Sequence, residues 1–401
     1  MTLYNANAID SLATAQLNQY NDEEIRIVVL KGQSKNNVLR VFADQIVEGL
    51  RRINKETTLI DLTDPISLKE FAELVQAGAV DGVLSFNAMM GDLFPENLKI
   101  PFVGWMVDSP HYHLTRLRHV GGRRHYIFPA DHHVDFLIQG QISAGSSVLL
   151  AGAKEARDNS KEFSERKIKV LMAASWMGEP QKFWLQFPQG HPYQKLVRTA
   201  IEILDEDQVV DTLSAFNKSA RLLNLEFSID NTFAAVASMT QSFIRQVDRI
   251  KFVKTLAGSG IPFTVVGDGW GSHIKVGTNV NYLNSIDSSK ISQLYADAKV
   301  VVNINASNGA CERLFDAMSV RACVLTDYSN TLFKIFESGR ELLFYDRKEP
   351  SSAIGVLEYA LDIDNWNLMT RRAQVVVAEN HLWSHRAEVI MKIFHSLRTC
   401  T

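Results

Sequence analysis

The feature that most constrains this chain is a repeated alternation between short apolar runs and longer segments with helical spacing. The run Ile25 to Leu30 (IRIVVL) is rich in β-branched residues and too short for a helix, which is typical of a strand buried on both faces. A loop over 31–37, a segment over 38–53 with an apolar residue every fourth position, and a second apolar run over 57–62 follow it. This order predicts parallel strands joined by right-handed crossovers.

The same alternation continues along the chain and predicts two α/β units. In the first half we expect further strands at 82–86, 102–107 and 125–129 and a helix at 67–77. In the second half we expect strands at 168–173, 263–266, 300–304, 322–326 and 342–345 and helices at 290–297, 311–319 and 332–337. Strands that alternate with helices form open, doubly wound sheets. The expected fold class is therefore α/β, with two Rossmann-like domains that face a cleft.

Two segments break the alternation and suggest the domain organisation. Residues 154–169 are dense in charge and lack an apolar face, which fits either a linker or a solvated surface helix. Residues 180–249 have helical spacing over a stretch too long for one crossover, so we expect a helical insertion in the second domain. Its simplest packing is on that domain, and an acceptor platform or a subunit contact in a homo-oligomer is the alternative. The expected domains are 1–165 and 166–380, followed by a carboxyl-terminal helix over 381–401.

Composition excludes several classes of function. The 401 residues include 42 Lys plus Arg and 45 Asp plus Glu, which gives a net charge of -3. The chain therefore lacks the excess of basic residues that general nucleic-acid binding requires. Cys311, Cys323 and Cys400 have spacings that suit neither a disulfide framework nor a zinc site. No secretory signal and no run of roughly 20 apolar residues occurs, so we expect a cytoplasmic protein without a transmembrane segment. The P-loop, zincin and α/β-hydrolase motifs are also absent from the sequence.

Two loops that follow predicted strands are candidate phosphate-binding sites, because open parallel sheets bind ligands beyond the carboxyl ends of their strands. The loop Gly267 to Gly271 has three alternating glycines, although Ser272 replaces the third glycine of a dinucleotide fingerprint, and a plain strand-exit turn is the alternative. The segment Asn303 to Met318 passes from a strand through a small, polar loop into a helix, whose free N–H groups attract phosphate.

Charged side chains at the start of that helix are candidates for the chemistry. Arg313 carries a guanidinium that can grip a pyrophosphate, and Glu312 and Asp316 share one helix face with Asn308 just ahead of it. The alternative is a helix whose acidic residues in the first turn merely favour the helix dipole.

The strand over 102–107 delivers a third set of polar residues to its carboxyl end. Asp108, His111 and His113 there suit a general base and contacts to sugar hydroxyls, with a turn capped by Asp108 as the alternative. The loop over 31–37 either closes over the cleft or is a mobile loop. The run His132 to Asp135 is not expected to bind a metal ion, because adjacent side chains point apart.

Several motifs together resemble those of CgeB-like glycosyltransferases of the GT-B fold. The resemblance covers residues 250–395 and lies in the runs YADAKVVVNI, ERLFDAM, ACVLTD and GRELLFY, with the ending HLWSHRA. Trp105 to Pro110 is similar to the W-x-x-D-x-P strand end of their first domain. The resemblance implies a transferase that takes a sugar from a nucleotide-diphosphate donor, UDP-sugar foremost, without an obligatory metal ion or other cofactor. The acceptor would be a glycan, a lipid, a protein or a small molecule.

The resemblance also implies roles for particular residues. Asp316 would contact the donor ribose, Arg313 the diphosphate, and Asp108 or His111 the acceptor, while the carboxylate expected eight residues before Asp316 is replaced by Asn308. Glu312 is the candidate substitute, so retention or inversion stays open. The full donor-binding set is Gly267, Asp268, Gly269, Trp270, Asn305, Asn308, Gly309, Arg313 and Asp316, and the catalytic set is Asp108, His111 and Glu312. A sugar or nucleotide binder without catalysis and a sugar-nucleotide epimerase fit the same fold.

Overall fold

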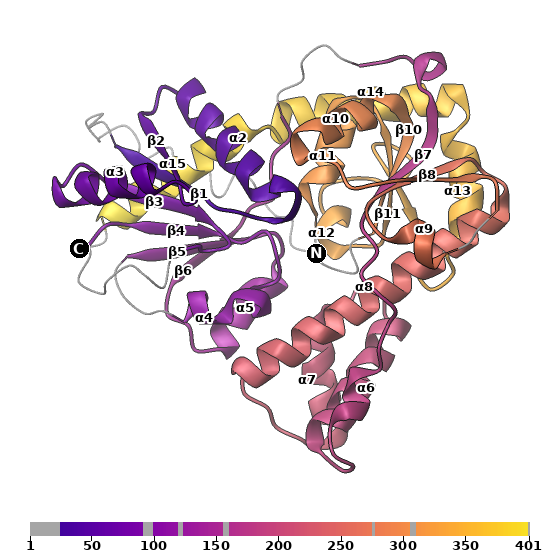
Figure 1. Ribbon diagram of the computed structural model, residues 1–401, viewed down its shortest axis with the longest axis horizontal. Helices are drawn as coiled ribbons and strands as arrows, with labels where there is room; N and C mark the ends of the chain where they lie inside the picture. The colour runs from indigo at the N-terminus through magenta and orange to yellow at the C-terminus, as the bar shows by residue number, and fades with distance from the viewer. Residues whose placement is uncertain are drawn as a thin grey trace.

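The computed structural model describes residues 25–90, 99–118, 123–154, 160–274, 277–304 and 310–399. Within these residues, the strands form two parallel sheets of six strands each, which lie side by side in Figure 1. The first sheet has the order β2-β1-β3-β4-β5-β6. Its strands are β1 (Ile27–Lys31), β2 (Thr57–Asp61), β3 (Gly82–Phe86), β4 (Phe102–Trp105), β5 (Arg124–Phe128) and β6 (Gly145–Val148).

The second sheet has the order β12-β11-β10-β7-β8-β9. Its strands are β7 (Ile168–Ala173), β8 (Phe263–Val266), β9 (Val280–Leu283), β10 (Ala298–Asn303), β11 (Cys323–Asp327) and β12 (Leu343–Tyr345). β9 is a strand that the sequence pattern did not predict, because this edge strand alternates half-buried and exposed residues and includes the polar Asn281.

Both strand orders reverse direction once, and the reversals locate the ligand-binding edge of each sheet. The first sheet reverses between β1 and β3, and the second, a doubly wound order, reverses between β7 and β10. Ligands of such sheets bind outside the carboxyl ends of the strands at these points. The predicted α/β fold with two Rossmann-like domains is confirmed, and its two switch points are where a site should be sought.

Helices cover both sheets. In the first domain they are α2 (Val38–Arg52), α3 (Pro65–Gln76), α4 (Leu114–Leu117) and α5 (His132–Gln139), with 3-10 turns η2 (Lys35–Asn37) and η3 (Pro110–His113). In the second domain they are α9 (Trp270–His273), α10 (Ser288–Asp297), α11 (Glu312–Ser319), α12 (Asn330–Phe333), α13 (Ser352–Ala360) and α14 (Ile363–Asn380), preceded by the turn η4 (Phe163–Glu165). In the described part of the chain, none of the helices is long and apolar enough to cross a membrane.

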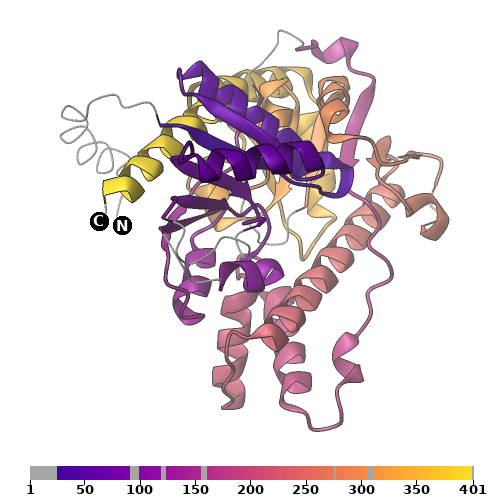
Figure 2. The ribbon, with the colours of Figure 1, turned by 60° about the vertical axis from the view of Figure 1, so that its left-hand side comes forward.

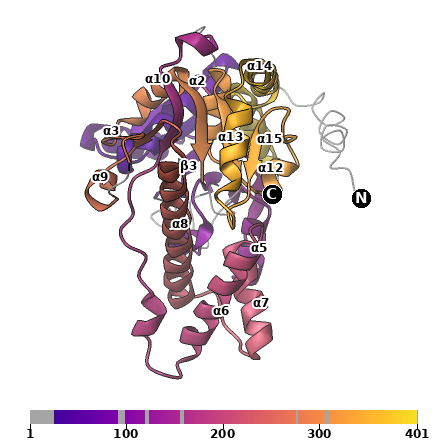
Figure 3. The same ribbon diagram turned by 90° about the vertical axis from the view of Figure 1, so that its right-hand side faces the viewer.

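The helical insertion lies between β7 and β8 and consists of η5 (Phe183–Gln186), α6 (Pro192–Glu206), α7 (Thr212–Leu223) and α8 (Asn231–Ser259). Helix α8 runs from beneath the first domain to the second, and α6 and α7 lie along its first half (Figures 1 and 3). Asp230 starts α8 by accepting a hydrogen bond from the N–H of Phe233 at 2.8 Å.

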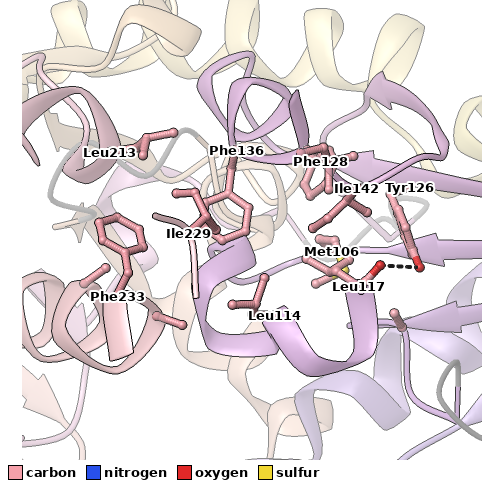
Figure 4. Packing of buried hydrophobic residues seen from close by; sticks show 14 of the residues in the cluster. Met106, Leu114, Leu117, Tyr126, Phe128, Phe136, Ile142, Leu213, Ile229 and Phe233 are labelled. Atoms are coloured by element: carbon pink, nitrogen blue, oxygen red, sulfur yellow. Dashed lines mark hydrogen bonds between the residues drawn. The ribbon is translucent and has the colours of Figure 1, made fainter. Parts of the chain in front are cut away.

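The insertion packs mainly on the first domain, which corrects the expectation that it would pack on the second. Figure 4 shows Leu213, Ile229 and Phe233 of the insertion against Leu114 and Phe136 of the first domain, in one buried cluster. Only the last part of α8, with Phe252, Val253 and Leu256, joins the core of the second domain. Helical spacing shows that a helix has an apolar face, but it does not show which domain that face covers.

The carboxyl-terminal helix α15 (Trp383–Thr399) returns to the first domain and packs beside α2 (Figure 2). Trp383 enters the aromatic cluster of the first sheet, 5.3 Å from Phe42 and 5.5 Å from Trp105 between ring centroids. A Cβ at Gly49 would lie 2.7 Å from the carbonyl oxygen of Trp383, so α2 admits this crossing only with glycine there. The HLWSHRA segment therefore contributes to the packing of the first domain and not to the cleft.

The charged segment over 154–169 is partly structural. Residues 155–159 lie outside the described residues, but Arg166 is buried and its guanidinium donates to the carbonyls of Ala298 and Val320 at 2.7 Å each. The guanidinium also stacks on Trp366 at 4.8 Å. These contacts of Arg166 attach the end of this segment to the second domain immediately before β7.

Candidate functional site

Two cavities of about 540 and 460 Å³ lie between the domains and share part of their walls. The larger, which we call the second-domain cavity, is lined by residues that follow β7 and β9 and by α10 and α11. The smaller, which we call the first-domain cavity, is lined by residues that follow β3, β4 and β5. Both lie where the sheet topology predicts ligands, and each has the size of a small-molecule site.

The shared wall, which we call the junction, is strongly basic. Both cavities are lined by Lys35, Arg245, Arg249, Glu312 and Arg313, together with the apolar Val38 and Phe42. Among the described residues, four cations thus face one carboxylate at the point where the two cavities meet. Like charges repel, so this arrangement favours binding of an anion between the domains.

Two of these cations come from α8 and were not predicted from the sequence. Arg245 and Arg249 are one helical turn apart and therefore share a face of the helix. The side-chain Nε atoms of both are buried without a hydrogen-bond partner among the described residues. Burial, together with the charges of Arg245 and Arg313, lowers the pKa of Arg249 to about 9. Arg249 is only 9% exposed, and its Nη1 lies 3.1 Å from the sulfur of Met177.

Arg313 lies at the start of α11, where the sequence predicted a phosphate-binding group. Its Nη1 donates to Oδ1 of Asn303 at 3.3 Å, and the Nδ2 of Asn303 donates to Thr326 at 3.1 Å. Burial opposes its charge, but Cys311, Tyr295 and the carboxylate of Glu312 outweigh this effect and raise the pKa of Arg313. Asn303, at the carboxyl end of β10, is thus a positioning residue for Arg313.

Asp316 lines the second-domain cavity one turn after Glu312, as the helical spacing predicted. Its Oδ1 accepts the backbone N–H of Lys154 at 3.2 Å. Burial raises the pKa of Asp316 to about 6, against the opposing effect of Lys154. The side chain can therefore accept hydrogen bonds from a ligand as a carboxylate at neutral pH.

The loop Gly267 to Trp270 supports the second-domain cavity from behind and is not among the residues that line either cavity. Gly267 has φ +154°, and a Cβ there would lie 2.3 Å from the carbonyl oxygen of Ala174. Trp270 is buried and donates from Nε1 to the same carbonyl at 2.6 Å. Asp268 is bound to Ser285, whose N–H it accepts at 2.9 Å. Together with Gly269, whose φ is +89°, this loop fixes the segment 174–176, which does line the cavity.

Asp108 lines the first-domain cavity and is held by Asn87, a residue that the sequence analysis missed. The amide Nδ2 of Asn87 donates to Asp108 Oδ2 at 2.8 Å, while its Oδ1 accepts the N–H of Val107 at 2.9 Å. Burial alone would raise the pKa of Asp108, but His113, Asn87 and the charge of Arg245 together lower it. Asp108 is therefore an ionised carboxylate with a fixed orientation.

His113, rather than His111, is the imidazole beside that carboxylate. His113 Nε2 lies 3.7 Å from Asp108 Oδ2, and Arg116 Nη1 lies 3.4 Å from His113 Nδ1. If Arg116 donates to Nδ1, the ring proton is on Nε2 and faces Asp108. His111 is buried between Tyr112 and Phe136 and does not line the cavities, and burial lowers its pKa to about 3. The 3-10 turn η3 separates the two histidines in this way.

The predicted site residues Asn305, Asn308 and Gly309 lie outside the described residues. Among the others, the structure brings Glu312, Arg313, Asp316 and Asp108 to the cavities, and it leaves His111 and the glycine loop behind them. The four-residue spacing of the arginines in α8 was the available signal for Arg245 and Arg249. Among the described residues, no three His, Cys, Asp or Glu side chains are grouped to hold a metal ion; the predicted metal independence stays a prediction.

The loop that precedes α2 bridges the two domains next to the junction. This agrees with the first of the two predictions for the loop, that it closes over the cleft. Asn37 Nδ2 donates to Asp287 Oδ2 at 2.7 Å, and Ser288 Oγ donates to the carbonyl of Asn36 at 2.7 Å. Both asparagines have positive φ, 56° and 59°. The loop thereby places Lys35 at the junction.

A larger hollow of about 1610 Å³ lies between α2, α10 and the start of α15. Among its charged side chains, Arg52 pairs with Glu48 at 2.9 Å and Lys161 pairs with Asp297. It is lined by later residues of α2 and by none of the residues that directly follow β1, β3, β7 and β10, the strands at the two switch points. We therefore place the candidate site at the two smaller cavities.

Comparison with known proteins supports a glycosyltransferase-like domain in the second half of the chain. Residues 245–392 match a family model described as glycosyl transferase-like. This match includes Arg245, Arg249 and Arg313 of the junction. No curated protein matches the chain in sequence. The finer resemblance to CgeB-like enzymes stays a prediction.

Several solved structures share the fold of this chain at very low sequence identity. Sucrose-phosphate synthase from Thermosynechococcus elongatus superposes with a TM-score of 0.55 at 10% identity, over 94% of this chain and 100% of that one. HepE of Anabaena, solved with UDP and glucose, gives 0.54 at 11% identity, over 93% and 100%. T4 phage BGT with its UDP-glucose substrate gives 0.50 at 8% identity, over 93% and 98%. The chain thus has the two-domain GT-B fold.

Proposed function

We propose that this protein is a glycosyltransferase that moves a sugar from a nucleotide-diphosphate donor to an acceptor hydroxyl. The observation that carries the proposal is the basic junction between the two cavities, where Arg245, Arg249 and Arg313 meet at the edge of both domains. The match of residues 245–392 to a glycosyl transferase-like family and the GT-B fold support the same reading.

We assign the nucleoside to the second-domain cavity and the diphosphate to the junction. Asp316 would accept hydrogen bonds from the ribose hydroxyls, and Arg249 and Arg313 would donate to the phosphate oxygens. UDP is the proposed nucleotide, in line with the UDP-bound structures of HepE and T4 phage BGT. The transferred sugar would then project into the first-domain cavity toward Asp108.

The reaction forms a bond between the acceptor oxygen and the anomeric carbon of the sugar and breaks the bond from that carbon to the diphosphate oxygen. The bonding electron pair leaves with the diphosphate, whose growing negative charge Arg249 and Arg313 stabilise. The acceptor hydroxyl loses its proton to Asp108, which Asn87 and His113 hold in place. Glu312, at the junction, faces the sugar ring as positive charge develops there.

Calorimetric binding of UDP and UDP-glucose, followed by a transfer assay that measures released UDP, tests the proposal. We expect UDP to bind the native protein and raise its melting temperature. Arg313→Met should weaken UDP binding by about 10-fold or more, since a charge-assisted hydrogen bond contributes about 1.5–3 kcal/mol. Arg198→Met is the matched control, because Arg198 is an exposed arginine on α6.

The outcomes separate the proposed transferase from its alternatives. Binding of UDP without turnover of any donor would indicate a binding protein, and conversion of one donor into another without an acceptor would indicate an epimerase. No binding of any nucleotide to the folded protein would overturn the assignment of the junction. An equal loss of binding in Arg313→Met and Arg198→Met would show that overall charge, and not the junction, holds UDP.

A further inference from the structure

The two arginines of α8 act on different domains, although they are one helical turn apart. The charge of Arg249 acts on Arg313, Cys311 and Asp327, all in the second domain. The charge of Arg245 acts on Asp108 and His111, both in the first domain. Both guanidiniums line both cavities, and these charge effects associate Arg249 with the donor side and Arg245 with the acceptor side of the cleft.

Arg245 has unused hydrogen-bonding capacity on the acceptor side. Its Nε is buried and has no partner among the residues that the structure describes, although the side chain lines the first-domain cavity. A second guanidinium, that of Arg116, lines the same cavity. Its Nη1 contacts no carboxylate among the described residues; it lies 3.2 Å from the carbonyl oxygen of Asn87 and 3.4 Å from His113 Nδ1.

The charges that line the first-domain cavity do not balance, even with a donor in place. The described cations are Lys35, Arg116, Arg245, Arg249 and Arg313, and the described carboxylates are Asp108 and Glu312. The diphosphate of a bound donor adds two negative charges near Arg249 and Arg313. A positive charge still remains, and it lies on the side of Arg116 and Arg245.

We propose that the acceptor carries an anionic group, a phosphate or a carboxylate, which Arg116 and Arg245 bind while its hydroxyl lies at Asp108. The inference rests on the proposed function and specifies the acceptor class of the same site. His133 adds a neutral donor or acceptor at this cavity, because it is 4% exposed and its Nδ1 has no partner among the described residues. A neutral sugar would leave this positive charge unbalanced.

Anion binding to the protein saturated with UDP tests this inference, since UDP then occupies the junction. Methyl phosphate and acetate are the two probes, one for each source of the anionic group, and titration calorimetry measures their binding. We expect one of them to bind in the millimolar range or tighter. Arg116→Met and Arg245→Met should each weaken that binding at least 10-fold. Arg116 lines only the first-domain cavity, so Arg116→Met should also change the affinity for UDP less than threefold. Arg245→Lys, which keeps the charge, should restore part of the anion binding.

Each remaining outcome counts against the inference. If neither probe binds to the UDP-saturated protein, the acceptor-side anion site does not exist. If binding persists in both methionine variants and in neither case differs from the control Arg198→Met, the anion is held elsewhere. If UDP itself fails to bind, the proposed function falls, and the same titration without UDP still tests whether Arg116 and Arg245 form an anion site.

Discussion

Replacing Arg249 should stabilise the free protein and weaken its hold on the donor. Burial and neighbouring charges lower the pKa of this guanidinium from 12.5 to about 9. At about 1.4 kcal/mol per pH unit, the charge therefore costs the empty protein roughly 5 kcal/mol at neutral pH. Arg249→Met removes the charge and keeps an apolar chain of similar length. We expect a gain of about 1–4 kcal/mol in the free energy of unfolding, the range seen when apolar side chains replace buried charges.

The same change should reduce the affinity for UDP. A charge-assisted hydrogen bond to phosphate contributes about 1.5–3 kcal/mol, which corresponds to a loss of roughly 10-fold to 150-fold in affinity. Urea unfolding without ligand measures the gain in stability, and calorimetric titration with UDP measures the loss in affinity. The two effects have opposite signs because an anion that binds Arg249 removes the cost of its unpaired charge.

Arg347→Met is the matched control. Arg347 is buried like Arg249, but its Nη1 lies 3.0 Å from Asp248, the residue that precedes Arg249 in α8. Loss of the Arg347 guanidinium leaves Asp248 unpaired and should lower the free energy of unfolding by about 3–5 kcal/mol. The affinity for UDP should stay the same. If Arg249→Met destabilises the protein as Arg347→Met does and leaves UDP binding unchanged, Arg249 is a structural residue and the reasoning fails.

Three further changes test other parts of the structure. Asp108→Asn should lower the transfer rate about 100-fold to 10,000-fold at unchanged UDP affinity, because the acceptor proton loses its base; a loss below threefold in a steady-state assay would remove Asp108 from that role. Gly267→Ala should lower the free energy of unfolding, measured in urea, by roughly 1–3 kcal/mol, because its Cβ would lie 2.3 Å from Ala174 O at φ +154°. The control Gly258→Ala in α8, where the Cβ has open space around it, should leave the free energy of unfolding unchanged or raise it. The pKa of His111 is about 3 in the folded protein and near 6.5 when unfolded, so its contribution to stability is complete above pH 6.5 and declines as the pH falls toward 4. His111→Phe should therefore reduce the slope of unfolding free energy against pH by up to about 1.4 kcal/mol per unit between pH 6 and 4, and an unchanged slope in urea titrations would show that His111 is protonated in the fold.

The sequence predicted those parts of the fold and site that depend on local pattern. Apolar runs such as Ile25 to Leu30 become strands because only a buried strand satisfies both their length and their β-branching. Glu312 and Asp316 share a helix face because four residues complete about one turn. Loops after strands lie at the cleft because all the strands of each sheet are parallel.

The parts that could not be predicted depend on contacts between segments far apart in the chain. Nothing local distinguishes Arg249, which faces the cleft, from Asp248, which faces Arg347 99 residues away. Asn87 becomes important only because β3 and β4 are neighbours, which places its amide 2.8 Å from Asp108. His111 and His113 have the same residue type and differ only in the side of a 3-10 turn on which each one lies.

Helix α8 connects the two halves of the site. Its 29 residues span about 43 Å, with one end packed in the core shared with the first domain and the other in the core of the second. Arg245 and Arg249 are about 6 Å apart along this axis, so one rigid element carries a cation for each side of the cleft. A donor held by Arg249 needs Arg313 of the second domain nearby, and an acceptor held by Arg245 needs Asp108 of the first. Under the proposed assignments, the donor and the acceptor thus contact the same rigid helix.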